Sequence, residues 1–125
     1  MKIFRIEAED GKGPYTSKHY WKNWEKYHSG WKFPDSYPTP HKEGIIEVSY
    51  QWHSGFISAE QLLDWFTRDQ LLEIENTYPG FRISIYSVKA KFRNCSKKQA
   101  IFCKEEAKIV KTYTIKQFLK ANSCL

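Results

Sequence analysis

The sequence has no apolar run that approaches the roughly 18 residues that a membrane-spanning helix needs. Its opening stretch, MKIFRIEAED, also lacks the apolar core of a secretory signal. Cysteine is scarce, and Cys95, Cys103 and Cys124 form no Cys-x-x-Cys pair. This spacing predicts ordinary reduced thiols, neither a disulfide framework nor a metal site. We therefore expect a cytoplasmic protein without a membrane anchor.

Several catalytic and ligand-binding signatures are missing as well. The four histidines lie between His19 and His53, and none stands in a His-x-x-x-His or His-Glu-x-x-His pair, so no zinc site is predicted. The chain has neither a Gly-x-Gly-x-x-Gly nor a Walker sequence. His53 beside Ser54 does not make a catalytic triad. From these residues alone we expect no metal and no cofactor.

The remaining composition is that of a folded domain. The chain has 125 residues, of which 41% are hydrophobic and 17% aromatic. This length suits one domain, and this content of apolar residues can fill a core. We therefore treat residues 1–125 as a single domain.

Alternating or compact apolar patterns predict five strands. They span residues 2–7, 45–52, 81–88, 99–103 and 107–115. Residues 17–30 predict a short aromatic helix, the proline-rich residues 31–44 a long loop, and residues 53–56 a turn. Residues 89–98 are polar and basic, and residues 115–122 predict a strand extension or one helical turn.

Two capping boxes predict two short helices in the middle of the chain. Ser58 and Gln61 begin the stretch GFISAEQLLDWF as one box, and Thr67 and Gln70 form another of the same type. Leucine and aromatic residues then follow at helical spacing. The order of elements predicts an α+β fold with a mostly antiparallel sheet, two short central helices and a long aromatic-rich loop region.

Charge is distributed unevenly along the chain. The net charge is +6, but residues 1–76 hold 9 basic and 12 acidic residues, whereas residues 77–125 hold 11 basic and 2 acidic ones. A cationic C-terminal part suits an acidic partner, and the alternative is that its lysines protect strand edges. The candidate basic binding residues are Lys89, Lys91, Arg93, Lys97 and Lys98.

Aromatic residues interleaved with lysines are concentrated between residues 15 and 52. This pattern suits base stacking beside neutralised phosphates, a protein interface, or packing of an irregular region against the sheet. The aromatic candidates for binding are Tyr15, Trp21, Trp24 and Trp31.

The stretches KIFRIEAEDGKGPY, GFISAEQLLDWF, FRISIYSV, KKQAIF and AKIV together resemble a family of small proteins of phages and prophages without assigned function. Their order is similar to that of ADP-ribosyltransferase folds, in a degenerate form. The resemblance implies that Arg5 would hold NAD, that Ser58 would brace the nicotinamide pocket, and that Gln99 takes the late-strand position of the catalytic acid. Glutamine cannot supply the carboxylate that this reaction requires, so Glu105 or Glu106 would have to do so.

Each of these residues also has a structural interpretation. Arg5 suits an edge-strand charge, Gln99 a solvent-facing strand position and Ser58 a helix cap. With the resemblance, we expect a phage-derived inhibitor that binds and blocks a host protein or nucleoprotein, such as a nucleic-acid-guided defence complex, in an anti-CRISPR-like role. The second prediction is an NAD-dependent mono-ADP-ribosyltransferase, and the third is a nucleic-acid-binding protein. Each would act in the cytoplasm of the infected cell.

Overall fold

The computed structural model describes residues 1–9, 11, 52–77 and 80–124. The predicted helix at 17–30, the proline-rich loop at 31–44 and nearly all of the predicted strand at 45–52 lie outside these residues. The fold is α+β, as predicted, and its strands are paired antiparallel.

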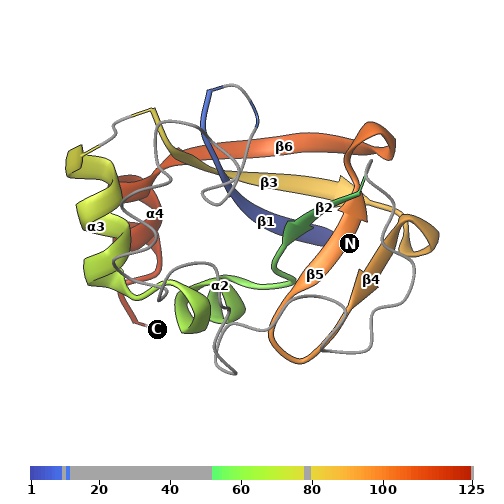
Figure 1. Cartoon of the computed structure of the whole chain (residues 1–125), viewed down its shortest axis with the longest axis horizontal. Coiled ribbons are helices and arrows are strands. Elements are labelled where there is room, and N and C mark those ends of the chain that lie inside the picture. The colour runs from blue at the N-terminus through green and yellow to red at the C-terminus, as the bar shows by residue number, and fades with distance from the viewer. Residues whose placement is uncertain (10, 12–51, 78–79, 125) are drawn as a thin grey trace, which may run out of the picture.

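The strands form two sheets. Sheet A contains β1 (Lys2–Glu7), β3 (Arg82–Val88) and β6 (Ala107–Thr114), in the order β1-β3-β6. Sheet B contains β2 (Trp52–Gly55), β5 (Ala100–Cys103) and β4 (Arg93–Cys95), in the order β2-β5-β4. In Figure 1, sheet A crosses the upper half of the molecule, and β4 and β5 lie at the end opposite α3 and α4.

Three α-helices lie among the described residues. They are α2 (Ala59–Trp65), α3 (Arg68–Thr77) and α4 (Ile115–Ala121). Two short 3-10 helices also occur: η2 (Ala90–Phe92) directly precedes β4, and η3 (Lys104–Glu106) lies between β5 and β6. Within the described ranges, none of the helices is long and apolar enough to cross a membrane.

The helix starts follow the capping chemistry of the sequence. The Thr67 hydroxyl accepts from the Gln70 N–H at 3.2 Å, and the Gln70 side chain accepts from the Thr67 N–H at 3.0 Å, which confirms the second box. Ser58 accepts from the Gln61 N–H at 3.0 Å. The Gln61 side chain accepts from the Ile57 N–H at 2.9 Å, one residue earlier than a capping box requires.

Sheet A separates two cores. Residues on opposite strands of an antiparallel pair share a face, so Ile6 lies on the same face as its partner Ile83. These two pack with Leu62, Phe66 and Phe118 from the helices. Ile3 and its partner Tyr86 lie on the other face and pack with Phe102 of sheet B, whose ring centroid is 5.1 Å from that of Tyr86.

The two sheets meet where Phe4 pairs with Phe56, just after β2. Each N–H donates to the carbonyl of the other residue, at 2.7 and 2.8 Å. Gly55 permits this crossing, since a Cβ there would lie 2.5 Å from Cγ2 of Ile3 and 3.1 Å from the Phe4 carbonyl oxygen. This crossing brings β2 over the face of β1 that carries Arg5 and Glu7.

Two local predictions are corrected, and one strand was not predicted. Residues 53–56 were expected to turn, but His53 to Gly55 continue β2 because they pair with Ala100 to Phe102. Residues 93–95, within the polar and basic stretch for which no element was predicted, form β4 beside β5. Residues 115–121 form a helix of two turns, because Thr114 and Gln117 make a complete capping box and Ile115, Phe118 and Leu119 are buried.

Candidate functional site

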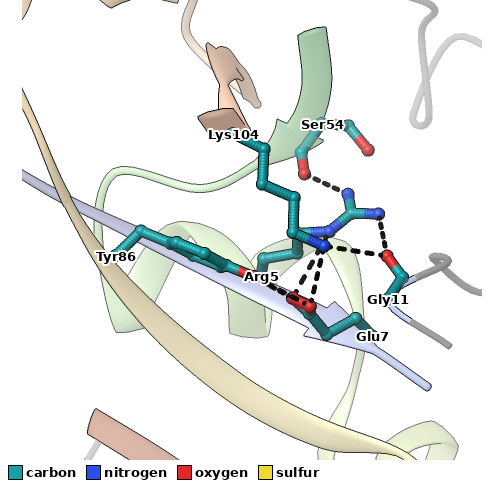
Figure 2. Close-up of polar contacts among 6 residues, drawn as sticks. All are labelled: Arg5, Glu7, Gly11, Ser54, Tyr86 and Lys104. Carbon is teal, nitrogen blue, oxygen red and sulfur yellow. Dashed lines mark hydrogen bonds and ion pairs between the residues drawn. The ribbon is translucent and has the colours of Figure 1, made fainter. Parts of the chain in front are cut away.

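A cluster of buried charged and polar groups lies between the two sheets. Arg5 and Glu7 stand two residues apart on β1, so their side chains leave the same face of the strand. Tyr86 of β3 and Lys104, which follows β5, complete the cluster with the backbone carbonyls of Gly11 and Ser54. Figure 2 shows the four side chains converging from three separate segments of the chain.

Glu7 is the centre of the cluster and is only 1% exposed. Its carboxylate accepts from the Tyr86 hydroxyl, 2.9 Å from Oε2, and from Lys104 Nζ, 3.3 Å from Oε2. Arg5 Nε lies 3.8 Å from Oε1. Burial, together with the hydrogen bond to Glu7, raises the pKa of Tyr86 well above its usual value, so Tyr86 remains a neutral donor.

Arg5 is 4% exposed and is bound by the chain itself. Nη1 donates to the Ser54 carbonyl at 2.7 Å, and Nη2 donates to the Gly11 carbonyl at 3.1 Å. Nε has no hydrogen-bond partner among the described residues. Burial lowers the pKa of Arg5, and the charge of Glu7 partly opposes this shift. The arginine therefore depends on Glu7 for its counter-charge.

Gly11 supplies one carbonyl to both cations. Lys104 Nζ donates to it at 3.2 Å, in addition to the bond from Arg5. Gly11 has φ of +79°, a conformation that glycine adopts without steric cost, and its N–H closes a turn onto the Ala8 carbonyl at 2.9 Å. A Cβ at this position would lie 2.9 Å from Lys104 Nζ. The glycine therefore fixes the geometry of both donors.

His53, on β2, borders the cluster. Burial lowers its pKa, and the positive charges of Arg5 and Lys104 lower it further, while Glu7 acts in the opposite direction. The imidazole is therefore neutral at pH 7. No group of three or more potential metal ligands occurs in the part of the chain that the structure describes.

The cluster acts as a cross-link between distant segments. The terminal nitrogens of Arg5 are occupied by carbonyls of the chain, and the Glu7 carboxylate is surrounded by Tyr86, Lys104 and Arg5. Binding of NAD by Arg5 stays a prediction. The interpretation of Arg5 as an edge-strand charge needs a correction, because β1 is an edge strand of sheet A but its arginine is buried under β2.

The other residues of the predicted transferase set lie in different places. Ser58 is the N-cap of α2. Gln99 directly precedes β5 and is 4% exposed, so its interpretation as a solvent-facing residue is wrong; its carbonyl accepts from the Ser96 N–H at 2.8 Å. Glu105 is exposed in η3, at the opposite end of β5 from Gln99. NAD transfer by these residues stays a prediction.

The predicted basic residues lie on one continuous segment of the chain. Lys89, Lys91, Arg93, Lys97 and Lys98, hereafter the basic segment, run through η2, β4 and the turn into β5. Lys89, Lys91 and Lys97 are exposed, and Arg93 and Lys98 are half-buried. The aromatic candidates Tyr15, Trp21, Trp24 and Trp31 lie outside the described residues, so their role stays a prediction.

Gln61 anchors the basic segment to α2. Its side-chain amide donates to the carbonyl of Lys97 at 3.0 Å and to that of Ser96 at 3.3 Å, while its oxygen accepts from Ile57. Gln61 is only 8% exposed. One glutamine therefore holds the turn between β4 and β5 against the start of α2.

Three residues of the polar cluster were not identified from the sequence, namely Glu7, Tyr86 and Lys104. The position of Glu7 two residues after Arg5 in an alternating strand is a signal that could have found it. Tyr86 and Lys104 are 79 and 97 residues away from Glu7 in the chain, so only the strand pairing brings them together.

A family model matches nearly the whole chain. The model of the Bacteriophage T4 Y00F protein family matches residues 1–116, a range that includes β1, all of the residues around Glu7 and the whole of both sheets. No curated protein and no solved structure matched the chain. The expectation of a small phage protein is confirmed: this chain belongs to the Bacteriophage T4 Y00F protein family.

Proposed function

We propose that the protein binds and blocks a host macromolecule during infection, and that the basic segment is its contact surface. Membership of a phage protein family supports a role in the infected cell. The observation that carries the proposal is the gathering of five cations within residues 89–98, in a region where residues 77–104 contain no acidic residue.

The positions of these cations suit electrostatic recognition. Lys89, Lys91 and Lys97 are exposed, and the turn that carries Lys97 is held in place by Gln61. A fixed cluster of one sign steers an oppositely charged partner and raises the association rate, an effect that salt weakens. The target is therefore an anionic surface, and a nucleic-acid-guided defence complex is the candidate, in an anti-CRISPR-like role.

Binding through charge is favoured here over stacking on bases. Phe92 is the aromatic residue in this segment, and it packs against the core between the sheets while Lys91 Nζ lies 5.0 Å above its ring. Sequence-independent binders of single strands use exposed rings together with cations. Among the described residues of the segment, the cations are present without such a ring.

The test is protection of a phage from a host defence. A host strain with an active CRISPR system that targets the phage is made to express the protein, and the efficiency of plating is measured. We expect plating to recover with the wild-type chain, to fall with Lys89→Gln/Lys97→Gln, and to be retained with Lys116→Gln/Lys120→Gln, which removes the same charge from exposed positions on α4.

A second measurement separates the candidate targets. The tagged chain is incubated with host lysate at low and at high salt, and the bound material is identified by mass spectrometry and nucleic-acid staining. A stoichiometric protein or nucleoprotein that is lost with Lys89→Gln/Lys97→Gln supports the proposal. Retention of naked nucleic acid alone would support the third prediction instead, and no partner together with no plating recovery would reject the inhibitor.

A further inference from the structure

We propose that the outer edge of β6 is a second docking surface, which accepts an extended strand of a protein whose residues alternate between acidic and apolar side chains. The inference extends the proposed function, and it rests on that function only in assigning the strand to a host protein. It is carried by features of β6 that lie outside the basic segment.

The first feature is the exposure of this edge. Sheet A ends at β6, and no described residue pairs with its outer side. β6 has eight residues, whereas the edge strand β4 of sheet B has three. The β1 and β2 edges meet at the Phe4–Phe56 bridge. β6 is therefore the long edge left open among the described strands, and such an edge is a template for pairing.

The second feature is an apolar pair at the middle of the strand. Ile109 is 50% exposed and Val110 is 55% exposed, and these are among the few large apolar side chains of the described residues that face solvent. Neither is explained by packing, since the buried part of β6 is confined to its ends, where Ala107 and Tyr113 contact the two cores. Burial of these two side chains would contribute to binding.

The third feature is a β-bulge that sets the face of the sheet on which Lys108 and Lys111 lie. Ile85 pairs with Lys111 and Tyr86 pairs with Ile109, so Val110 is the extra residue. Lys108 pairs with Ser87, which lies two residues from Ile85 on β3. The bulge therefore places Lys108 and Lys111 on one face of the sheet, although residues three apart in a regular strand lie on opposite faces. Ile109 lies on the other face, with Tyr86.

These positions specify the pattern of the partner. A strand added to β6 places its side chains on the same face as the residues they oppose. Residues that oppose Lys108 and Lys111 would be acidic, and residues on the face of Ile109 would be apolar. Main-chain hydrogen bonds supply affinity in this mode, and the alternating side chains supply selectivity.

The same charges disfavour a second copy of this chain. An antiparallel β6–β6 pair that sets Ile109 against Val110 of the other copy also sets Lys108 against Lys111 of that copy. Like charges directly opposite each other destabilise a pair of strands. The lysines thus protect the edge from self-association and leave it open to an acidic strand.

The test uses a fluorescein-labelled peptide of alternating glutamate and valine, with an alternating lysine–valine peptide as its control. Binding to the full chain is followed by fluorescence anisotropy, and hydrogen exchange identifies the protected backbone amides. We expect the acidic peptide to protect amides of β6. Lys108→Glu/Lys111→Glu should weaken binding by about tenfold or more at low salt. Lys116→Glu/Lys120→Glu, with the same change in charge, should leave it unchanged.

The outcomes are distinct from those of the proposed function. Lys89→Gln/Lys97→Gln should bind the peptide normally, so loss of the host target by that variant does not bear on β6. The β6 proposal is overturned if the acidic peptide fails to bind, if it binds both double Glu variants equally, or if it protects other amides. A concentration-dependent dimer with protected β6 amides would assign the edge to a second copy and overturn it as well.

Discussion

Replacement of Glu7 by glutamine removes the counter-charge of two cations while conserving the volume of the side chain. Glu7 is 1% exposed and Arg5 is 4% exposed, so neither water nor salt can replace the lost carboxylate charge. Arg5 keeps the carbonyls of Ser54 and Gly11, but its Nε, which has no hydrogen-bond partner among the described residues, would lose the nearby anion.

The expected cost is large for one substitution. Breaking a buried ion pair by removing one partner costs about 3–5 kcal/mol. The amide of Gln still hydrogen-bonds with Tyr86, and Lys104 is 26% exposed and can reach water, so we expect the lower end of this range. A loss of about 3 kcal/mol corresponds to a fall in melting temperature of roughly 10 °C for a chain of this size.

Denaturant unfolding followed by circular dichroism measures this free energy, and two further variants separate its parts. Tyr86→Phe removes a hydrogen bond to a charged group, for which we expect about 1.5–3 kcal/mol. The double variant Arg5→Met/Glu7→Met removes both charges and should cost less than Glu7→Gln, because no buried cation is left unpaired. A cost for Glu7→Gln below about 1 kcal/mol would refute the reasoning that Arg5 depends on this carboxylate.

Three other outcomes can be checked on the purified chain. Gly55→Ala should destabilise the fold by about 1–3 kcal/mol through overpacking against Ile3, measured by denaturant unfolding; an unchanged midpoint would contradict the close crossing of β1 and β2. Ser58→Ala should cost about 1 kcal/mol by loss of the cap on the Gln61 N–H, and Ser58→Asp should restore most of it, which a role in binding nicotinamide would not predict. The free energy of unfolding should fall as the pH drops below about 6.5, because His53 has a lowered pKa in the fold and takes up a proton more readily in the unfolded chain. In denaturant unfolding at several pH values, His53→Gln should lose less stability over the same range. An identical pH profile for the variant would reject this cause.

The local elements were predictable where the pattern of the sequence depends on near neighbours. The alternation of residues 2–7 and 81–88 predicted β1 and β3, and the boxes at Ser58 and Thr67 predicted the starts of α2 and α3. The same signal is present at Thr114 and Gln117, where a complete capping box starts α4 in place of the expected strand extension or single turn.

The elements that were predicted wrongly depend on partners far away in the sequence. His53, Ser54 and Gly55 resemble a turn because small and polar residues are common in turns. They form a strand because β5 supplies hydrogen bonds from residues 100–102 and because Gly55 lets the chain pass close to Ile3. Neither condition can be seen from residues 53–56 alone.

The candidate site, too, was predictable only where its residues are near neighbours in the sequence. Arg5 was identified on its strand, but its burial and its carbonyl partners follow from the crossing of β2 over β1. The cations of the basic segment could be selected from the sequence, because they lie within ten residues of each other. Tyr86 and Lys104 could not be assigned to Glu7 without the pairing of β1 with β3 and of β2 with β5.

The position of Glu7 at the centre of the cluster also has a consequence for synthesis of the chain. Tyr86, which donates its hydroxyl to Glu7, lies 79 residues later in the chain, and Lys104 lies 97 residues later. At 5–20 residues per second, roughly 4–16 s pass between translation of Glu7 and translation of Tyr86. During that time β1 cannot pair with β3, although Phe4 can already pair with Phe56. Tyr86 and Lys104 are not available to Glu7 until then, so we expect the burial of Arg5 and Glu7 to be a late step in folding.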